Sequence, residues 1–304
     1  MNRFTANFLL LLGGLVWGFG FVAQATAMEN IGPFQFLASR FLLATVVMLP
    51  FCWWEWQRLK TSSDAVFPFS QTFRASILVG IIFFVMMALQ QVGILGTSVT
   101  NAGMLTGLYV ILTPILMVVF WSERAKTHVW IASAIALLGI WFLGGGGLDK
   151  FTWGDGLIII CAIFSALQVI AISLAVEKAK LPVAVATTQF AVCGVFGLIG
   201  FVVARMANWS LEPEFSTITF FAAAPEVLYA SVVAGAFAFT LQAIAQRYTT
   251  ASAAAVLLAS EAVFAAIGGA LVLDERLDFL GYAGCLLLFS AIVLVSYLSS
   301  QSQN

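Results

Sequence analysis

The second half of this chain repeats a pattern of its first half. When the sequence is shifted by 152 positions, residues 89–124 align with residues 241–276 without a gap. Leu105 then coincides with Leu257, and both stretches end in the dipeptide Glu-Arg. An internal repeat decides the architecture, because the fold must contain the same unit twice.

The two halves also match near their starts. Residues 17–33 resemble residues 164–182 when a two-residue gap is allowed, and a glutamate lies shortly before the closing proline of each stretch. We therefore expect two repeat units, at residues 1–147 and 148–304.

Most of the chain is apolar. Hydrophobic residues make up 62% of it, charged residues 9%, and the mean hydropathy is +1.04, whereas a soluble domain carries about 25% charged residues. This composition excludes a soluble protein, and no basic run indicates nucleic-acid binding. The apolar segments that can cross a membrane as helices are residues 6–26, 34–54, 75–95, 101–121, 129–146, 156–176, 182–204, 227–246, 253–273 and 279–298.

Ten segments divided between two units give five helices per unit. Because five is an odd number, the second unit enters the membrane in the opposite direction to the first. Such an inverted-topology repeat is typical of secondary transporters. The sequence thus predicts an all-α integral membrane protein with ten transmembrane helices built from two inverted five-helix repeats.

Lysine and arginine residues in the loops indicate the orientation. With the N-terminus inside, nine of them lie on the cytoplasmic side and three lie outside. We therefore expect both termini in the cytoplasm, with the protein in the cell inner (plasma) membrane. A signal peptide cleaved near residues 25–27 (ATA) would leave nine helices and the same orientation. The repeat favours retention, because the first helix is the partner of the sixth.

One acidic residue, Glu261, lies near the middle of the ninth apolar segment. An ionised carboxylate inside a membrane is unfavourable by several kcal/mol, so such a residue is usually paired, protonated or functional. Its neighbours are small, which places the helix inside the bundle. We interpret Glu261 as a group that binds a substrate amino group or carries a coupling proton. The alternative is a structural acid bonded to neighbouring helices.

Arg40 is the second candidate, one to two turns into the second segment. Its repeat counterpart is Gln189, so the two halves differ in charge. Arg40 is expected to hold a substrate carboxylate or to pair with an acid, and snorkelling to the interface is the alternative. Whether Arg40 pairs with Glu261 is left open, because their expected depths differ.

Several uncharged polar and aromatic residues also fall inside predicted helices. We expect some of them to line an aqueous cavity, and hydrogen bonding between helices is the alternative. Tyr109 is favoured because the repeat places it opposite Glu261. Trp17 is a candidate for stacking on a substrate, with helix packing as the alternative. The remaining candidates of this kind are Gln90, Gln242 and Asn101.

Other function classes find little support. The chain has no HExxH, GxSxG or nucleotide-binding motif, so we expect neither an enzyme nor an ATP-driven pump. The four cysteines are widely spaced and His128 is the only histidine, so no metal site and no cofactor are expected. A channel would need a filter motif. Close crossings at Gly14-xxx-Gly18 and Gly103-xxx-Gly107 are expected within one chain, which favours a monomer.

Short motifs recur at defined places in these segments. They are Trp17-Gly18, residues 40–44 (RFLLA), residues 112–114 (LTP) leading to Glu123-Arg124, and residues 260–266 (SEAVFAA) leading to residues 275–277 (ERL). Over nearly the whole chain, in two units, these motifs resemble the EamA family of the drug/metabolite transporter superfamily. The family often has proline after the glutamate of the ninth helix, where this chain has Ala262.

The resemblance implies ten helices around a central cavity and export of amino acids or related small metabolites. We expect alternating access, with a small-molecule substrate and the lipid bilayer as partners. The energy source would be the substrate gradient or protons. Sugars, drugs and polyamines stay open as alternative substrates of the same fold.

Overall fold

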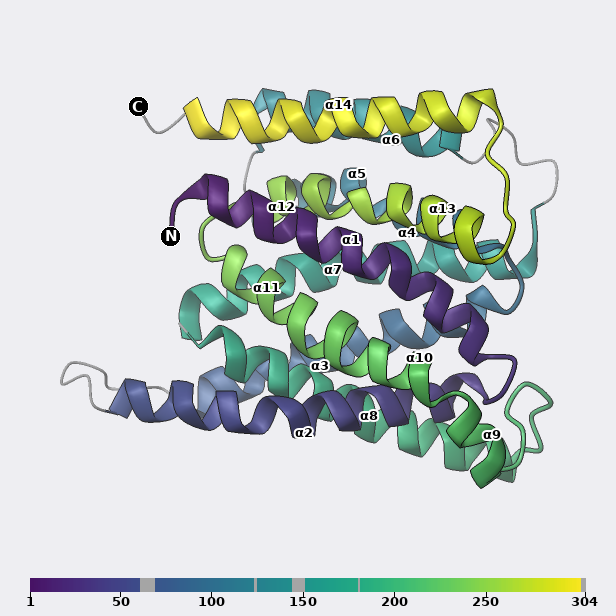
Figure 1. Ribbon diagram of the computed structural model, residues 1–304. Helices are drawn as coiled ribbons and strands as arrows, with labels where there is room; N and C mark the ends of the chain where they lie inside the picture. The colour runs from purple at the N-terminus through teal and green to yellow at the C-terminus, as the bar shows by residue number, and fades with distance from the viewer. Residues whose placement is uncertain (61–68, 123–124, 144–150, 180, 302–304) are drawn as a thin grey trace.

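The computed structural model describes residues 1–60, 69–122, 125–143, 151–179 and 181–301, and all regular structure within these ranges is helical (Figure 1). The first half contains α1 (Arg3–Ala27), α2 (Pro33–Lys60), α3 (Phe69–Ile94), α4 (Val99–Thr106), α5 (Tyr109–Trp121) and α6 (Thr127–Leu143). The second half contains α7 (Trp153–Ala179), α8 (Pro182–Met206), α9 (Thr217–Ala222), α10 (Ala224–Leu228), the π-helical stretch η1 (Tyr229–Phe237), α11 (Ala238–Ala245), α12 (Ala251–Leu258), α13 (Ser260–Val272) and α14 (Phe279–Gln301).

The helices of the described residues account for the ten predicted segments. Eight spans are long and apolar enough to cross a membrane, and α6 and α14 supply two shorter apolar stretches. Three of the eight are composite, because α4 continues into α5, α10 into η1 and α11, and α12 into α13. Exposed apolar side chains such as Val46, Ile199 and Phe289 cover outward faces of the bundle, as expected where lipid is the solvent. The all-helical, ten-helix membrane architecture is confirmed.

The two halves pack against each other according to an approximate twofold relationship. α2 lies along α8, and α6 lies along α14, so that two pairs of equivalent helices meet (Figure 1). α3 packs on α7 in the way that α1 packs on η1 and α11. Helices of the first half therefore pack directly against helices of the second half, and the core of the protein lies at the interface between the two halves.

Contacts at the helix ends show that α2 and α8 run antiparallel. Glu55, near the end of α2, lies at the start of α8, where its carboxylate accepts hydrogen bonds from the backbone amides of Val183 (3.2 Å) and Ala184 (2.8 Å). Glu212, after the end of α8, lies at the start of α2. Because α2 and α8 occupy equivalent positions in the repeat, this antiparallel arrangement is the geometry of an inverted repeat.

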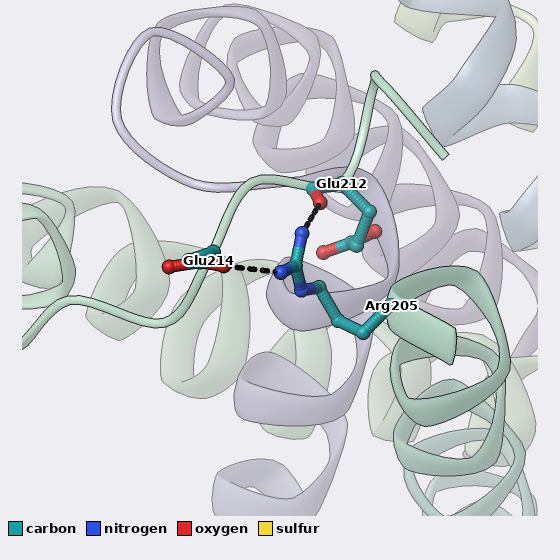
Figure 2. A network of polar contacts seen from close by, with 3 residues as sticks. All are labelled: Arg205, Glu212 and Glu214. Atoms are coloured by element: carbon teal, nitrogen blue, oxygen red, sulfur yellow. Dashed lines mark hydrogen bonds and ion pairs between the residues drawn. The ribbon is translucent and has the colours of Figure 1, made fainter. Parts of the chain in front are cut away.

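The Glu212 contact is supported by a second residue of the same loop. Its carboxylate accepts from the amides of Phe34 (2.8 Å) and Gln35 (3.0 Å). Arg205 donates to the backbone carbonyl of Glu212 (3.1 Å) and forms an ion pair with Glu214 (2.9 Å), as Figure 2 shows. The first amides of a helix have no partner within the helix, so a carboxylate there stabilises the helix start.

Glu275 forms a third contact of this kind. Its carboxylate accepts from the amides of Val99 and Thr100, both at 2.9 Å, and from the Thr100 hydroxyl. The glutamate of the second Glu-Arg dipeptide thus holds the start of α4, which belongs to the other half. Glu123-Arg124, the first dipeptide, lies outside the described residues.

Two membrane-spanning helices are interrupted at equivalent positions, 152 residues apart. Between α4 and α5 the amide of Val110 bonds to the carbonyl of Gly107 (3.0 Å), and at the start of α13 the amide of Ala262 bonds to the carbonyl of Ala259 (3.1 Å). These i to i+3 bonds tighten one turn, with ψ of −13° at Gly107 and −12° at Ala259. The interruption in the second half therefore forms although Ala262 stands where the resembling family often has proline.

Candidate functional site

A central cavity lies between the two halves, and its volume is about 50 Å³. It is lined from both repeats, by α1, α2, α3, α4, α5 and by α7, η1, α11, α12 and α13. The lining residues include six of the seven candidates from the sequence: Trp17, Arg40, Gln90, Tyr109, Gln242 and Glu261. The structure thus brings these six together at the interface of the repeats.

Tyr109 and Glu261 meet in this cavity. Tyr109 is the first residue of α5 and Glu261 the second residue of α13, so each directly follows an interruption of its helix. The two side chains are 3% and 5% exposed, and the Tyr109 hydroxyl is a hydrogen-bond partner of the Glu261 carboxyl. Glu261 also lies in the first turn of α13, where unpaired amides favour negative charge.

Arg40 reaches the cavity from α2 and is buried, and no acidic residue of the described ranges forms an ion pair with it. Its side chain is 3% exposed, and its guanidinium lies over the rings of Phe41 (4.5 Å) and Phe36 (5.4 Å). The Nε and Nη1 atoms are buried and have no hydrogen-bond partner. The ion pairs found within 4.0 Å among the described residues do not include Arg40 with Glu261. Burying a charge without a partner is strongly unfavourable, so the buried Arg40 guanidinium is an unusual feature of this cavity.

Trp17 is held rigidly at the edge of the cavity. Its indole N–H donates to the carbonyl of Ala234 (2.9 Å), which lies in the π-helical stretch η1, and its ring lies 4.3 Å from that of Phe239. A π-helical stretch leaves irregularly placed carbonyls and is frequent at functional sites. Trp17 therefore both joins α1 to η1 and presents a fixed aromatic surface to the cavity.

Glutamines from both halves supply the neutral polar lining. Gln90 donates to the Thr106 hydroxyl (3.4 Å). Gln242 and Gln168 exchange amide hydrogen bonds at 3.3 and 3.5 Å, and Gln168 also donates to Gln189 (3.2 Å). Gln189, the repeat counterpart of Arg40, thus belongs to an amide network rather than to a charged contact.

Asn101, the seventh candidate, does not line this cavity. It lies in the first turn of α4, where its backbone amide donates to the side chain of Ser98 (3.1 Å). Tyr109 follows eight residues later, and the interruption of the helix falls between the two. Eight helical residues correspond to about 12 Å, which places Asn101 toward the helix start that Glu275 holds.

The cavity also contains residues that sequence reasoning did not select as candidates. Among them are Thr106, Ser165, Phe239 and the pair Met86 and Met87. Ser165 is equivalent to Gly18 in the repeat, which offered a signal for its position. The methionines and Phe239 carried no signal beyond membrane hydropathy. In the described residues no group of three or more His, Cys, Asp or Glu side chains is arranged to hold a metal ion.

Comparisons with known proteins agree with this architecture. The EamA-like transporter family matches the chain twice, at residues 4–145 and 152–297, and each matched stretch falls within one of the two expected units. A protein of Archaeoglobus fulgidus described as an uncharacterized transporter is 29% identical over 303 residues, which cover 97% of this chain and 87% of that protein. A protein of known crystal structure shares the fold with a TM-score of 0.71 over 99% of both chains, at 14% identity.

Proposed function

The chain belongs to the EamA-like transporter family, and from that premise we propose that it exports amino acids or related small metabolites by alternating access. It is a multi-pass membrane transporter and not an enzyme. The observation that supports an amino-acid substrate is that Arg40 and Glu261 line one cavity without forming an ion pair with each other.

An amino acid fits the basic group and the acidic group of this cavity, Arg40 and Glu261. The Nε and Nη1 atoms of Arg40, which have no hydrogen-bond partner, suit a substrate carboxylate, because charge-assisted hydrogen bonds from a guanidinium to a carboxylate are strong. The Glu261 carboxylate suits a substrate ammonium group. The remaining lining is aromatic, thioether and amide, which suits an apolar or neutral side chain.

The alternative substrates are less suited to the charges of Arg40 and Glu261. A polyamine or a lipophilic cation would be repelled by the buried guanidinium, since no acidic residue among the described ones neutralises it within 4.0 Å. A sugar would stack on Trp17 but would leave both charged groups without a counterion. A zwitterion is the class that offers one partner to each group.

We place the N-terminal face, where α1 begins, in the cytoplasm of a cell with the protein in its inner (plasma) membrane. α1 begins and α14 ends at the same end of the bundle (Figure 1), and at that end Arg3 and Arg247 line a cavity of about 540 Å³. Loops rich in lysine and arginine tend to lie on the cytoplasmic side of a membrane. The larger cavity at this end would then face the cytoplasm, which is the side from which an exporter takes its substrate.

The experiment is uptake of labelled compounds into proteoliposomes that hold the purified protein. The panel contains neutral and charged amino acids, a sugar, a polyamine and a lipophilic cation, with Arg40→Gln as the central variant. Transport of an amino acid that Arg40→Gln reduces at least tenfold supports the proposal. Arg276→Gln is the matched control, because the Arg276 side chain is 86% exposed. Transport of only the sugar or a cation would refute the amino-acid assignment.

A further inference from the structure

The Arg40 guanidinium is in contact with aromatic rings. Its central carbon lies 4.5 Å from the centroid of the Phe41 ring and 5.4 Å from that of Phe36. Its Nε and Nη1 atoms have no hydrogen-bond partner, and the ion pairs found among the described residues do not include Arg40. A cation within about 6 Å of a ring centroid is attracted by the negative face of the ring, and more strongly where water is absent. The rings therefore supply the attraction that an acidic partner would otherwise give.

The Phe41 ring is itself fixed by other aromatic side chains. It stacks on the ring of Phe190, with centroids 5.9 Å apart and 20° between the planes, and is T-shaped to that of Phe83 at 5.0 Å and 75°. The three side chains are 0% exposed. Residues 40–41 correspond to residues 189–190 in the repeat, so the equivalent rings of the two halves meet where α2 packs along α8. In a close-packed interior such a ring has little freedom to move.

The backbone of α2 is also fixed at this place. A Cβ atom added to Gly194 of α8 would lie 2.8 Å from the amide nitrogen of Leu42, and one added to Gly197 would lie 2.8 Å from that of Ala38. Separations this short leave no room for a side chain, so α2 and α8 are in backbone contact before and after residues 40–41. Arg40 therefore extends from a fixed backbone, over a fixed ring, to the central cavity that it lines.

An aromatic face suits a guanidinium that must receive an anion. An acidic side chain of the protein would also hold Arg40, but it would occupy the N–H groups that a substrate carboxylate needs. A phenylalanine ring has no oxygen or nitrogen acceptor, so it attracts the charge without taking up these groups. The equivalent position of the second half has no such need, because Gln189 is neutral and its Oε1 atom accepts from Gln168 (3.2 Å).

We infer that Phe41 is a positioning residue for substrate binding, because its ring holds the Arg40 guanidinium at the place where the substrate carboxylate binds. The inference rests on the proposed function, in which Arg40 is the group that binds the carboxylate. Phe41 is fully buried and is not a lining residue of the central cavity, so it acts on the substrate only through Arg40. Phe36, one turn earlier in α2, supports the same guanidinium from a longer distance.

The test is the concentration of a labelled amino acid that gives half-maximal transport in proteoliposomes of the full-length protein. Phe41 is replaced by mono-, di- and trifluorophenylalanine, which nearly keep the shape of the ring and progressively weaken its negative face. Each added fluorine should raise the half-maximal concentration, by at least about tenfold for the trifluoro ring, with little change in the maximal rate. A role in packing alone would not produce this graded effect.

The same replacements at Phe190 are the matched control. Phe190 is the repeat counterpart of Phe41, and the cations found over aromatic rings in the described part of the chain, Arg40 and Arg58, do not lie over it. Fluorination there should leave the half-maximal concentration unchanged. Equal effects at Phe41 and Phe190 would overturn the inference.

Phe41→Leu gives a second measurement, because it removes the ring and keeps an apolar side chain. It should raise the half-maximal concentration about tenfold or more in the wild type. It should have no further effect in Arg40→Gln, where no guanidinium remains to be positioned. Additive effects of the two substitutions would contradict the positioning role. If Phe41→Leu does not fold, the fluorinated rings decide.

The outcomes separate this inference from the proposed function. Amino-acid transport that Arg40→Gln reduces, but that fluorination of Phe41 leaves unchanged, overturns the positioning role and leaves the proposed function intact. If the folded wild type transports no amino acid, the proposed substrate is wrong, and the inference is overturned with it.

Discussion

Tyr109 and Glu261 occupy equivalent positions of the two repeats and meet as hydrogen-bond partners in the central cavity. Each begins the second part of an interrupted helix. The backbone relationship is nearly symmetric, but one half contributes a phenol and the other a carboxylate. Arg40 and Gln189 differ in the same way. A symmetric fold therefore surrounds a chemically asymmetric site, which suits a substrate whose two ends differ.

Tyr109→Phe removes the hydroxyl that contacts Glu261 and keeps the ring. A hydrogen bond to a charged group contributes about 1.5–3 kcal/mol, and about 1.4 kcal/mol corresponds to a factor of ten. We expect the initial rate of amino-acid transport to fall about tenfold or more in proteoliposomes. Tyr282→Phe, at a 63% exposed position of α14, is the control and should transport as the wild type does. Equal transport rates in the two variants would contradict a role for the Tyr109 hydroxyl in transport.

Glu275→Ala removes the carboxylate at the start of α4. Loss of a side-chain cap is destabilising by about 0.5–2 kcal/mol, and this carboxylate accepts from two amides and a hydroxyl. We expect a lower melting temperature of the detergent-solubilised protein. Glu214→Ala is the control, because the Glu214 side chain is 87% exposed and pairs only at the surface. Equal melting temperatures for the two variants would show that Glu275 does not hold the halves together.

Glu212 should make stability depend on pH. The residue is 0% exposed, and burial raises the pKa of its carboxyl above the ordinary value of 4.5, against the opposing effect of the Phe34 and Gln35 amides and Arg205. The folded protein then keeps this proton to higher pH than the unfolded chain does. Its contribution to stability is present at acidic pH and is lost as pH rises from 4.5 through the raised pKa.

The measurement is the melting temperature of wild type and Glu212→Gln between about pH 4 and about pH 8. Other groups titrate in both proteins, so the difference between them isolates Glu212. The melting temperature of the wild type should fall relative to that of Glu212→Gln as the pH rises through the raised pKa. At higher pH the difference between the two melting temperatures should become constant. A shift in the opposite direction would mean that the amide donors outweigh burial and hold the pKa below 4.5.

Gly18→Ala should destabilise the contact between α1 and α13. A Cβ atom at position 18 would lie 2.7 Å from the backbone carbonyl carbon of Phe264, closer than the two helices allow. At Gly13, five residues earlier in α1, an added Cβ would meet the Leu258 side chain at 3.8 Å, an ordinary contact. We expect Gly18→Ala to lower the melting temperature and Gly13→Ala to leave it nearly unchanged. The reverse order would contradict the close packing of these helices.

The repeat and the hydropathy were sufficient to predict the ten helices, their inverted arrangement and the position of Tyr109 opposite Glu261. They could not show that Arg40 and Glu261 line one cavity without pairing, because that depends on side-chain reach across packed helices. The role of Glu275 was also hidden, since its partners, Val99 and Thr100, lie 176 and 175 residues away in the chain. The helix interruption at Ala259 could not be predicted from a proline, because Ala262 stands where the family often has one. Each of these features arises from tertiary contacts, which local patterns do not contain.

The central claim is that Arg40 and Glu261 bind the opposite ends of one substrate. The most direct measurement is counterflow in proteoliposomes of three labelled compounds: an α-amino acid, the amine that lacks its carboxylate, and the acid that lacks its amino group. We predict that the wild type moves only the amino acid, and that Glu261→Gln and Arg40→Gln each reduce this movement at least tenfold while remaining folded. Movement of the amine at the rate of the amino acid, or wild-type rates in Glu261→Gln, would contradict the claim.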